Sequence, residues 1–125
     1  MGRKLSKIKN ENLMEHINRI ELQGHVGTIR YNEHQGRRVV NFSLATELLY
    51  KSRDGQPVSE LTWHNIVAWD SKEIEDFDQI CKGAPVYVCG RLRAYKYTSA
   101  DGVDKTIYEV TANRLHLVRE DKTPQ

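Results

Sequence analysis

The sequence predicts an all-β domain of five strands, with one helix between the third and the fourth. Three observations support this prediction. Apolar and polar residues alternate with a period of two over much of residues 18–118, as in strands that bury one face. Glycine-containing turn signals separate two pairs of these runs. One run follows helical spacing instead, and it lies between the third and fourth alternating segments.

The first three strands lie before residue 70. The turn signal Arg-Asp-Gly at 53–55 separates the second strand from the third, which covers residues 61–69 and is rich in Thr, Trp, Ile and Val. The residues expected on the inner faces of the first two strands are Ile20, Leu22 and Val26, then Val40, Phe42, Leu44 and Thr46.

A helix is expected directly after the third strand. Asp70 can cap its N-terminus, and Glu73 three residues later completes a capping box. Gly83 suits the left-handed position that ends many helices. The apolar stripe of this helix is expected to consist of Ile74, Phe77, Ile80 and Cys81.

Two further strands, residues 84–97 and 105–118, are joined by a hairpin at Asp101-Gly102. The apolar parity of the last strand changes after Ala112, which predicts a β-bulge near Asn113. In the fourth strand, the residues expected on the inner face are Val86, Val88, Leu92 and Ala94. Strand, strand, strand, helix, strand, strand is the order of a five-stranded oligonucleotide/oligosaccharide-binding (OB) barrel.

Composition excludes several classes of protein. The chain has 125 residues, of which 38% are hydrophobic, and this length and composition suit one modest core. Its net charge is +2. Its longest uncharged apolar stretch, residues 66–69, is far too short to cross a membrane. No apolar segment follows the basic N-terminus, so a secretory signal is not expected. We therefore expect a cytoplasmic protein, associated with the nucleoid if it binds DNA, and no membrane partner.

No pattern for a metal, a cofactor or a catalytic centre is present. Cys81 and Cys89 lack Cys-x-x-Cys spacing and are expected to be buried thiols, and the five histidines are scattered. The nucleophile-elbow, phosphate-loop and zinc-protease motifs are absent, and the acidic residues of 70–78 suit a solvated surface. The prediction is a protein without enzymatic activity, cofactor or metal.

Aromatic and basic residues share the outward parity of the third and fourth strands. Trp63 and Trp69 have the same parity, so both should point to one face, although either could instead belong to the core. Tyrosine mixed with arginine on an exposed strand face suits stacking of bases with flanking phosphate contacts. On the fourth strand this outward set is Tyr87, Cys89, Arg91, Arg93, Tyr95 and Tyr97.

At these residues the sequence resembles the bacterial single-stranded-DNA-binding proteins. The most specific matches are Trp-His-Asn-Ile-Val at 63–67 and Gly-Arg-Leu-Arg at 90–93, in this order. The resemblance covers about residues 18–118. Its other matching segments are residues 18–27, 42–46, 82–88 and 108–110.

The resemblance implies roles for individual residues. It implies that His64 lies at a subunit interface, with a histidine of the core as the alternative. Tyr95 departs from the pattern, because a basic residue is common there. It also implies a homotetramer, with a dimer as the alternative. Bases would stack on Tyr50, Trp63, Trp69 and Tyr97, and the residues expected to follow the phosphate backbone are Lys51, Arg91, Arg93 and Lys96.

Three segments are expected: a basic N-terminal arm at 1–17, the OB domain at 18–118 and a short polar tail at 119–125. The resemblance leads us to expect a chain without the acidic C-terminal tip that recruits enzymes, as in a tailless paralogue or a truncated form. The predicted function is binding of single-stranded DNA with little sequence preference in replication, recombination or repair. The alternatives are a tailless primosome-type OB protein for replication restart and an OB module that binds only proteins.

Overall fold

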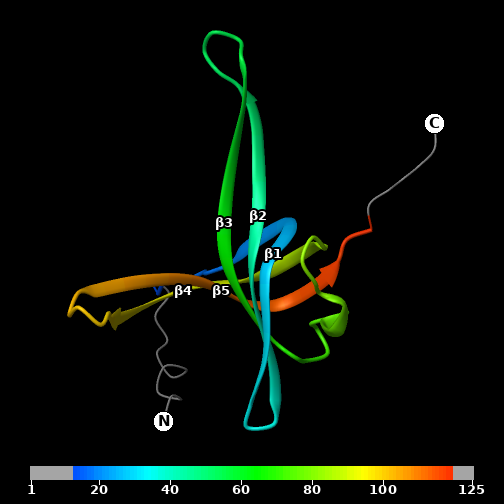
Figure 1. Ribbon diagram of the computed structural model, residues 1–125, viewed down its shortest axis with the longest axis vertical. Coiled ribbons are helices and arrows are strands. Elements are labelled where there is room, and N and C mark those ends of the chain that lie inside the picture. Colours follow the sequence, from blue (N-terminus) through cyan, green and yellow to red (C-terminus); the bar gives the residue numbers. More distant parts are fainter. Residues whose placement is uncertain (1–12, 120–125) are drawn as a thin grey trace.

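The structure, a computed structural model, describes residues 13–119. Within it, five strands form a closed barrel in the order β1-β2-β3-β5-β4, which is the predicted OB-fold (Figure 1). Neighbouring strands are antiparallel except β3 and β5, which are parallel. The predicted arm and tail lie mostly outside the described residues, so those boundaries stay predictions. The strands are β1 (Ile20–His34), β2 (Arg37–Lys51), β3 (Pro57–Trp69), β4 (Pro85–Thr98) and β5 (Asp104–Leu117).

The core contains the residues that the period of two places on the inner faces of the strands. Leu44, Val86, Val88 and Leu115 have no exposed surface, and Phe42 and Ile66 are almost completely buried. Ile74, Phe77 and Ile80, from the segment between β3 and β4, belong to the same cluster. Burial of this apolar surface is the main force that holds the barrel together.

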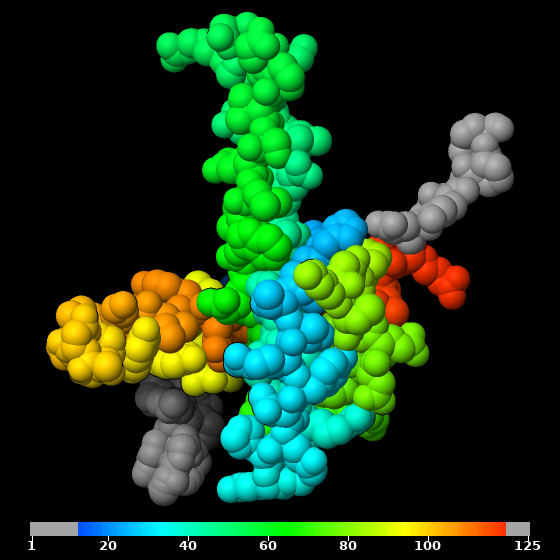
Figure 2. All heavy atoms as spheres, viewed as in Figure 1, coloured from blue at the N-terminus to red at the C-terminus, as the bar shows by residue number. Residues whose placement is uncertain are grey.

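Two hairpins extend well beyond this core. We call residues 46–62 the β2–β3 arm and residues 91–109 the β4–β5 arm; they project from the barrel in different directions (Figures 1 and 2). On the β2–β3 arm, Leu48, Leu49 and Leu61 are exposed. The prediction that Leu92 and Ala94 face the core is wrong, because β4 leaves the barrel after Gly90 and both residues are exposed.

Two bulges bend the strands where the barrel closes. Cys89 pairs with Arg114 and Gly90 with Ala112, so Asn113 is the extra residue, which confirms the predicted bulge. A second register shift lies between Val26 and Ile29 on β1. A bulge increases local twist, and barrel closure requires such bending.

The predicted helix is wrong: among the described residues, segment 70–83 contains only one 3-10 turn, η1 (Phe77–Gln79). The backbone N–H of Glu75 donates to Leu115 O at 2.8 Å, and Leu115 N–H donates to Glu73 O at 3.1 Å. These bonds to β5 occupy groups that a helix would use internally, and Asp76 has a left-handed φ of 56°.

The acidic residues of this segment anchor it rather than cap a helix. The Arg38 guanidinium donates to Asp70 at 2.6 Å and to Asp78 at 2.7 Å, and it lies 4.7 Å from the centre of the Phe77 ring.

Cys81 is exposed and only Cys89 is buried, so the expectation of two buried thiols is wrong for Cys81. Its place in the predicted stripe depended on a helix that does not form.

Candidate nucleic-acid interface

The outer face of the β1–β2–β3 sheet carries both tryptophans. In the ladder between β2 and β3, Trp63 pairs with Ala45 and Trp69 with Val39. Between them lie two further pairs, Ser43 with Asn65 and Asn41 with Val67, of the same outward parity. The two rings therefore lie at the ends of a strand face whose middle is mostly polar.

Trp63 is a surface residue whose ring packs against a glycine of β1. It is 56% exposed, so the alternative that it belongs to the core is wrong. A methyl group placed on Gly27 of β1 would lie 2.6 Å from the Trp63 ring, which shows that the ring lies against this glycine. Glycine thus lets the indole approach the strand while much of its surface faces solvent.

Trp69 lies nearer the turn between β1 and β2 and is half-buried. The Arg37 guanidinium lies 4.8 Å from the centre of its ring, and the His34 ring lies 6.2 Å away. A cation over an indole is attracted to the negative face of the ring. This contact brings a positive charge next to an aromatic surface, an arrangement that suits stacked bases with flanking phosphates.

Tyr50 and Lys51 are separated from the tryptophans. They lie near the tip of the β2–β3 arm, where Tyr50 pairs with Val58 and Lys51 with Pro57. Tyr50 is 47% exposed, but its parity places it on the face of the ladder opposite to Trp63. The structure therefore presents Tyr50 as an aromatic on the arm, not as part of the flat face that the tryptophans share.

The β4–β5 arm carries the other predicted residues. Arg91, Arg93 and Tyr97 share one parity and are exposed, whereas Lys96 has the other parity and is exposed on the opposite face of the arm. Tyr95 belongs to the first set, and its hydroxyl donates to Glu109 Oε1 at 3.2 Å. The Glu109 carboxylate raises the pKa of the Tyr95 hydroxyl by charge repulsion with the phenolate form.

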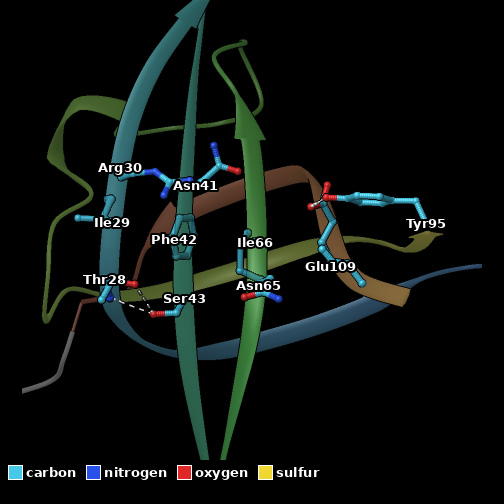
Figure 3. Close-up of a pocket in the computed structure, with 11 residues that line it drawn as sticks. Thr28, Ile29, Arg30, Asn41, Phe42, Ser43, Asn65, Ile66, Tyr95 and Glu109 are labelled. Atoms are coloured by element: carbon cyan, nitrogen blue, oxygen red, sulfur yellow. Dashed lines mark hydrogen bonds between the residues drawn. The ribbon is translucent and has the colours of Figure 1, made fainter. Parts of the chain in front are cut away.

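A polar cavity of about 480 Å³ opens on this side of the barrel (Figure 3). Sequence reasoning missed it as a site. The outward parity of Asn41, Ser43 and Asn65 was readable, but closure of the barrel was needed to add groups from β1, β4 and β5. Its polar lining consists of Thr28, Arg30, Asn41, Ser43, Asn65, Tyr95 and Glu109.

His64 has the inward parity of β3 at the point where the barrel core ends. Its Nε2 lies 2.9 Å from Thr46 Oγ1, and partial burial lowers the pKa of its imidazole. It lines a second cavity of about 380 Å³ together with Trp63, Leu92 and Tyr108, all of which are exposed. The exposed Trp63, Leu92 and Tyr108 side chains place apolar surface beside this cavity, and exposed apolar surface is a feature of protein–protein contact sites.

The described residues hold no group of three or more His, Cys, Asp or Glu side chains that could bind a metal ion. No helix between residues 13 and 119 is long and apolar enough to span a bilayer.

Comparison with known proteins relates this architecture to one family. The model of the single-strand binding protein family matches residues 17–118. The single-stranded DNA-binding protein of Neisseria meningitidis serogroup A is 33% identical over 105 residues, which are 82% of this chain and 60% of that protein. The one from Xanthomonas axonopodis pv. citri is also 33% identical, over 82% of this chain and 58% of its own length. The chain therefore spans about 60% of the length of these relatives.

Solved structures show the same fold. A chain from the Plasmodium falciparum SSB complex with ssDNA superposes with a TM-score of 0.71 at 32% identity, covering 87% of this chain and 99% of that one. The small single-stranded DNA-binding protein of Streptomyces coelicolor superposes with a TM-score of 0.65 at 21% identity, over 84% of this chain and 96% of that one, and shows the fold alone. On the family match and the identity to its relatives, this chain belongs to the single-strand binding protein family.

Proposed function

We propose that this protein binds single-stranded DNA with little sequence preference and, without catalysis, protects it during replication, recombination or repair. The observation that carries the proposal is the exposed Trp63 indole seated on Gly27, on the same side of β3 as Trp69. Stacking tolerates any base because every base has a π-face. The solved Plasmodium falciparum relative, a complex with ssDNA, supports the same conclusion.

The backbone of the DNA is assigned to exposed cations on the two arms. Lys51 lies on the β2–β3 arm, and Arg91, Arg93 and Lys96 lie on the β4–β5 arm. Because the arms project in different directions, a strand that contacts both must bend around the barrel between them (Figure 2). Tyr50 and Tyr97 lie on these arms and are proposed to stack bases at the ends of the path, with Trp63 and Trp69 between them.

The experiment is a titration of fluorescently labelled oligo-dT, followed by anisotropy at several salt concentrations. Four phosphate contacts on single strands predict a log–log salt slope of roughly −3, since each releases about 0.7 counterion. Duplex DNA of the same length should bind much more weakly, because its bases are not free to stack. If oligo-dT does not bind at low salt, the proposal is refuted, and the alternative of an OB module that binds only proteins is favoured.

We also propose that the protein is a homo-oligomer, with a tetramer expected and a dimer as the alternative. The support is the second cavity, where His64 lies beside the exposed side chains of Leu92 and Tyr108. A small barrel buries a limited core alone, and a subunit contact there would cover apolar surface. Light scattering at micromolar concentration tests this: a stable dimer favours the primosome-type alternative, and a concentration-independent monomer contradicts the proposal.

A location in the cytoplasm, at the nucleoid, follows from the proposed substrate and remains part of the proposal. Fluorescence microscopy of a tagged full chain would test it. A diffuse signal that does not colocalise with the nucleoid would contradict the proposal.

A further inference from the structure

The polar cavity contains a carboxylate that backbone binding does not explain. Glu109 of β5 is half-buried in it, directly across the ladder from Arg93 of β4. A negative charge beside a predicted phosphate contact repels the DNA backbone and lowers affinity. Figure 3 shows Glu109 and Tyr95 on one side of this cavity and Arg30 with Asn41 on the other, with Asn65 between them.

Several groups in the cavity already have partners, and the remainder face solvent. Ser43 Oγ accepts the backbone N–H of Thr28 at 2.9 Å, and Asn65 Nδ2 donates to Tyr108 O at 3.3 Å. Tyr95 occupies one oxygen of Glu109. Within residues 13–119, no partner is found for Glu109 Oε2, Asn65 Oδ1, the Asn41 amide or the Arg30 guanidinium. The cavity therefore offers acceptors on the β3 and β5 sides and donors on the β1 and β2 sides.

The cavity is large enough to hold a nucleobase and is bordered by an aromatic ring. Its volume of about 480 Å³ lies within the range of roughly 300–1,000 Å³ typical of small-molecule sites. Tyr95 is 42% exposed, and its hydroxyl donates a hydrogen bond to Glu109 that links the two side chains. A base against this ring would have its polar edge close to the carboxylate.

The chemistry of a carboxylate selects among bases. Ionised Glu only accepts hydrogen bonds, and it pairs with the exocyclic amino group of cytosine. Thymine carries a carbonyl oxygen in place of the amino group and a protonated ring nitrogen in place of the bare one. A carboxylate at the position of the amino group would therefore face an acceptor in thymine. An arginine across the cavity can donate to the ring nitrogen and carbonyl that cytosine also carries.

We propose that this cavity is a nucleobase subsite that takes an amino-bearing base, cytosine rather than thymine, with Glu109 as the acceptor that discriminates. The inference rests on the proposed binding of single-stranded DNA. A preference at one subsite is compatible with general binding, because a strand can slide until a suitable base enters the cavity.

The experiment compares oligo-dC and oligo-dT of equal length and label, bound by wild-type protein and by Glu109→Gln. Removing the negative charge raises affinity for both strands, so the ratio of the two dissociation constants is the readout. Glutamine can donate to the thymine carbonyl, so the ratio Kd(dT)/Kd(dC) should fall by about 3- to 10-fold, within the discrimination that one base contact supplies.

Two further variants make the result specific. Glu60→Gln removes the same charge from the β2–β3 arm, away from the cavity, and should leave the ratio unchanged. Tyr95→Phe keeps the ring but removes the hydroxyl that holds Glu109, so the ratio should fall in the same direction by a smaller factor. If Glu109→Gln does not fold, the change in ratio for Tyr95→Phe decides the question.

The outcomes separate the subsite from the general function. A wild-type protein that binds neither oligonucleotide refutes the proposed function and the subsite together. Tight binding of both, with a ratio that Glu109→Gln changes by less than about twofold, refutes the subsite and leaves the general function intact. An equal change for Glu60→Gln shows that bulk charge, not the cavity, sets the ratio, and also overturns the inference.

Discussion

Substituting Trp63 with alanine tests whether stacking on the β1–β2–β3 face supplies binding energy separately from charge. The indole is 56% exposed and rests on Gly27, so the variant removes an open aromatic surface and no charge. The two contributions differ in salt dependence, because only phosphate contacts release condensed counterions.

The structure sets a limit on how much Trp63→Ala destabilises the fold. An aromatic side chain can bury about 150–250 Å², and slightly less than half of Trp63 is covered. At about 25 cal/mol per Å², the loss is roughly 2 kcal/mol, as an upper estimate. A domain of this size is typically stable by about 5–15 kcal/mol, so the variant should stay folded at 25 °C.

Loss of the stacked base should cost about 1–3 kcal/mol of binding free energy, which is roughly a 5- to 150-fold weaker Kd for oligo-dT. The assay is anisotropy of a short labelled oligo-dT that fills one barrel, at several salt concentrations, with a thermal melt of each variant. The log–log slope should stay nearly unchanged for Trp63→Ala, whereas Arg93→Ala should reduce its magnitude by about 0.7.

Trp63→Phe is the matched control, because it keeps an aromatic ring on Gly27 and should retain most of the affinity. Wild-type affinity in a folded Trp63→Ala variant would show that the face is assigned wrongly. A slope that changes as much as in Arg93→Ala would show that the effect is electrostatic, and would refute the reasoning in the same way.

Three other predictions concern the neighbours of this face and the fold. Gly27→Ala places a methyl group 2.6 Å from the Trp63 ring, so it should displace the indole, shift its fluorescence and weaken oligo-dT binding without unfolding the protein. An unchanged fluorescence spectrum would contradict the contact between the indole and Gly27. Burial lowers the pKa of His64, so the folded state resists its protonation, and the free energy of unfolding should fall as pH drops below about 6.5. The midpoints of urea unfolding measure this fall, and His64→Gln should flatten this part of the pH profile. Arg38→Ala removes the links to Asp70 and Asp78 and should speed amide exchange in residues 70–80, with a small loss of stability because these ion pairs are exposed. Unaltered exchange would show that the links do not hold the segment.

The parts of the fold that follow local periodicity could be predicted from the sequence. Side chains alternate across a strand, so a run such as Val40, Phe42 and Leu44 identifies a strand and its buried face without knowledge of any neighbour. The change of parity after Ala112 located the bulge at Asn113 for the same reason. The outward parity of Trp63 and Trp69 could be predicted too, although the exposed fraction of each side chain could not.

Features that depend on partners distant in the chain were decided by the tertiary structure. Residues 70–83 have the capping and spacing of a helix, but Glu73 and Glu75 bond to Leu115 of β5. Arg38 binds Asp70 at the start of the segment and Asp78 within it. Local propensity is weak, and such contacts override it.

Exposure along the arms and the shape of the cavity also required the closed barrel. Leu92 has the same parity as Val88, but β4 leaves the barrel after Gly90, so the pattern continues where no core remains to bury it. The polar cavity takes side chains from all five strands, among them Arg30 of β1 and Glu109 of β5. The sequence by itself determined the strands, their inner faces within the barrel and the aromatic residues, because these depend on spacing along one strand. Closure of the barrel decided which side chains meet, because it brings together residues that are far apart in the chain.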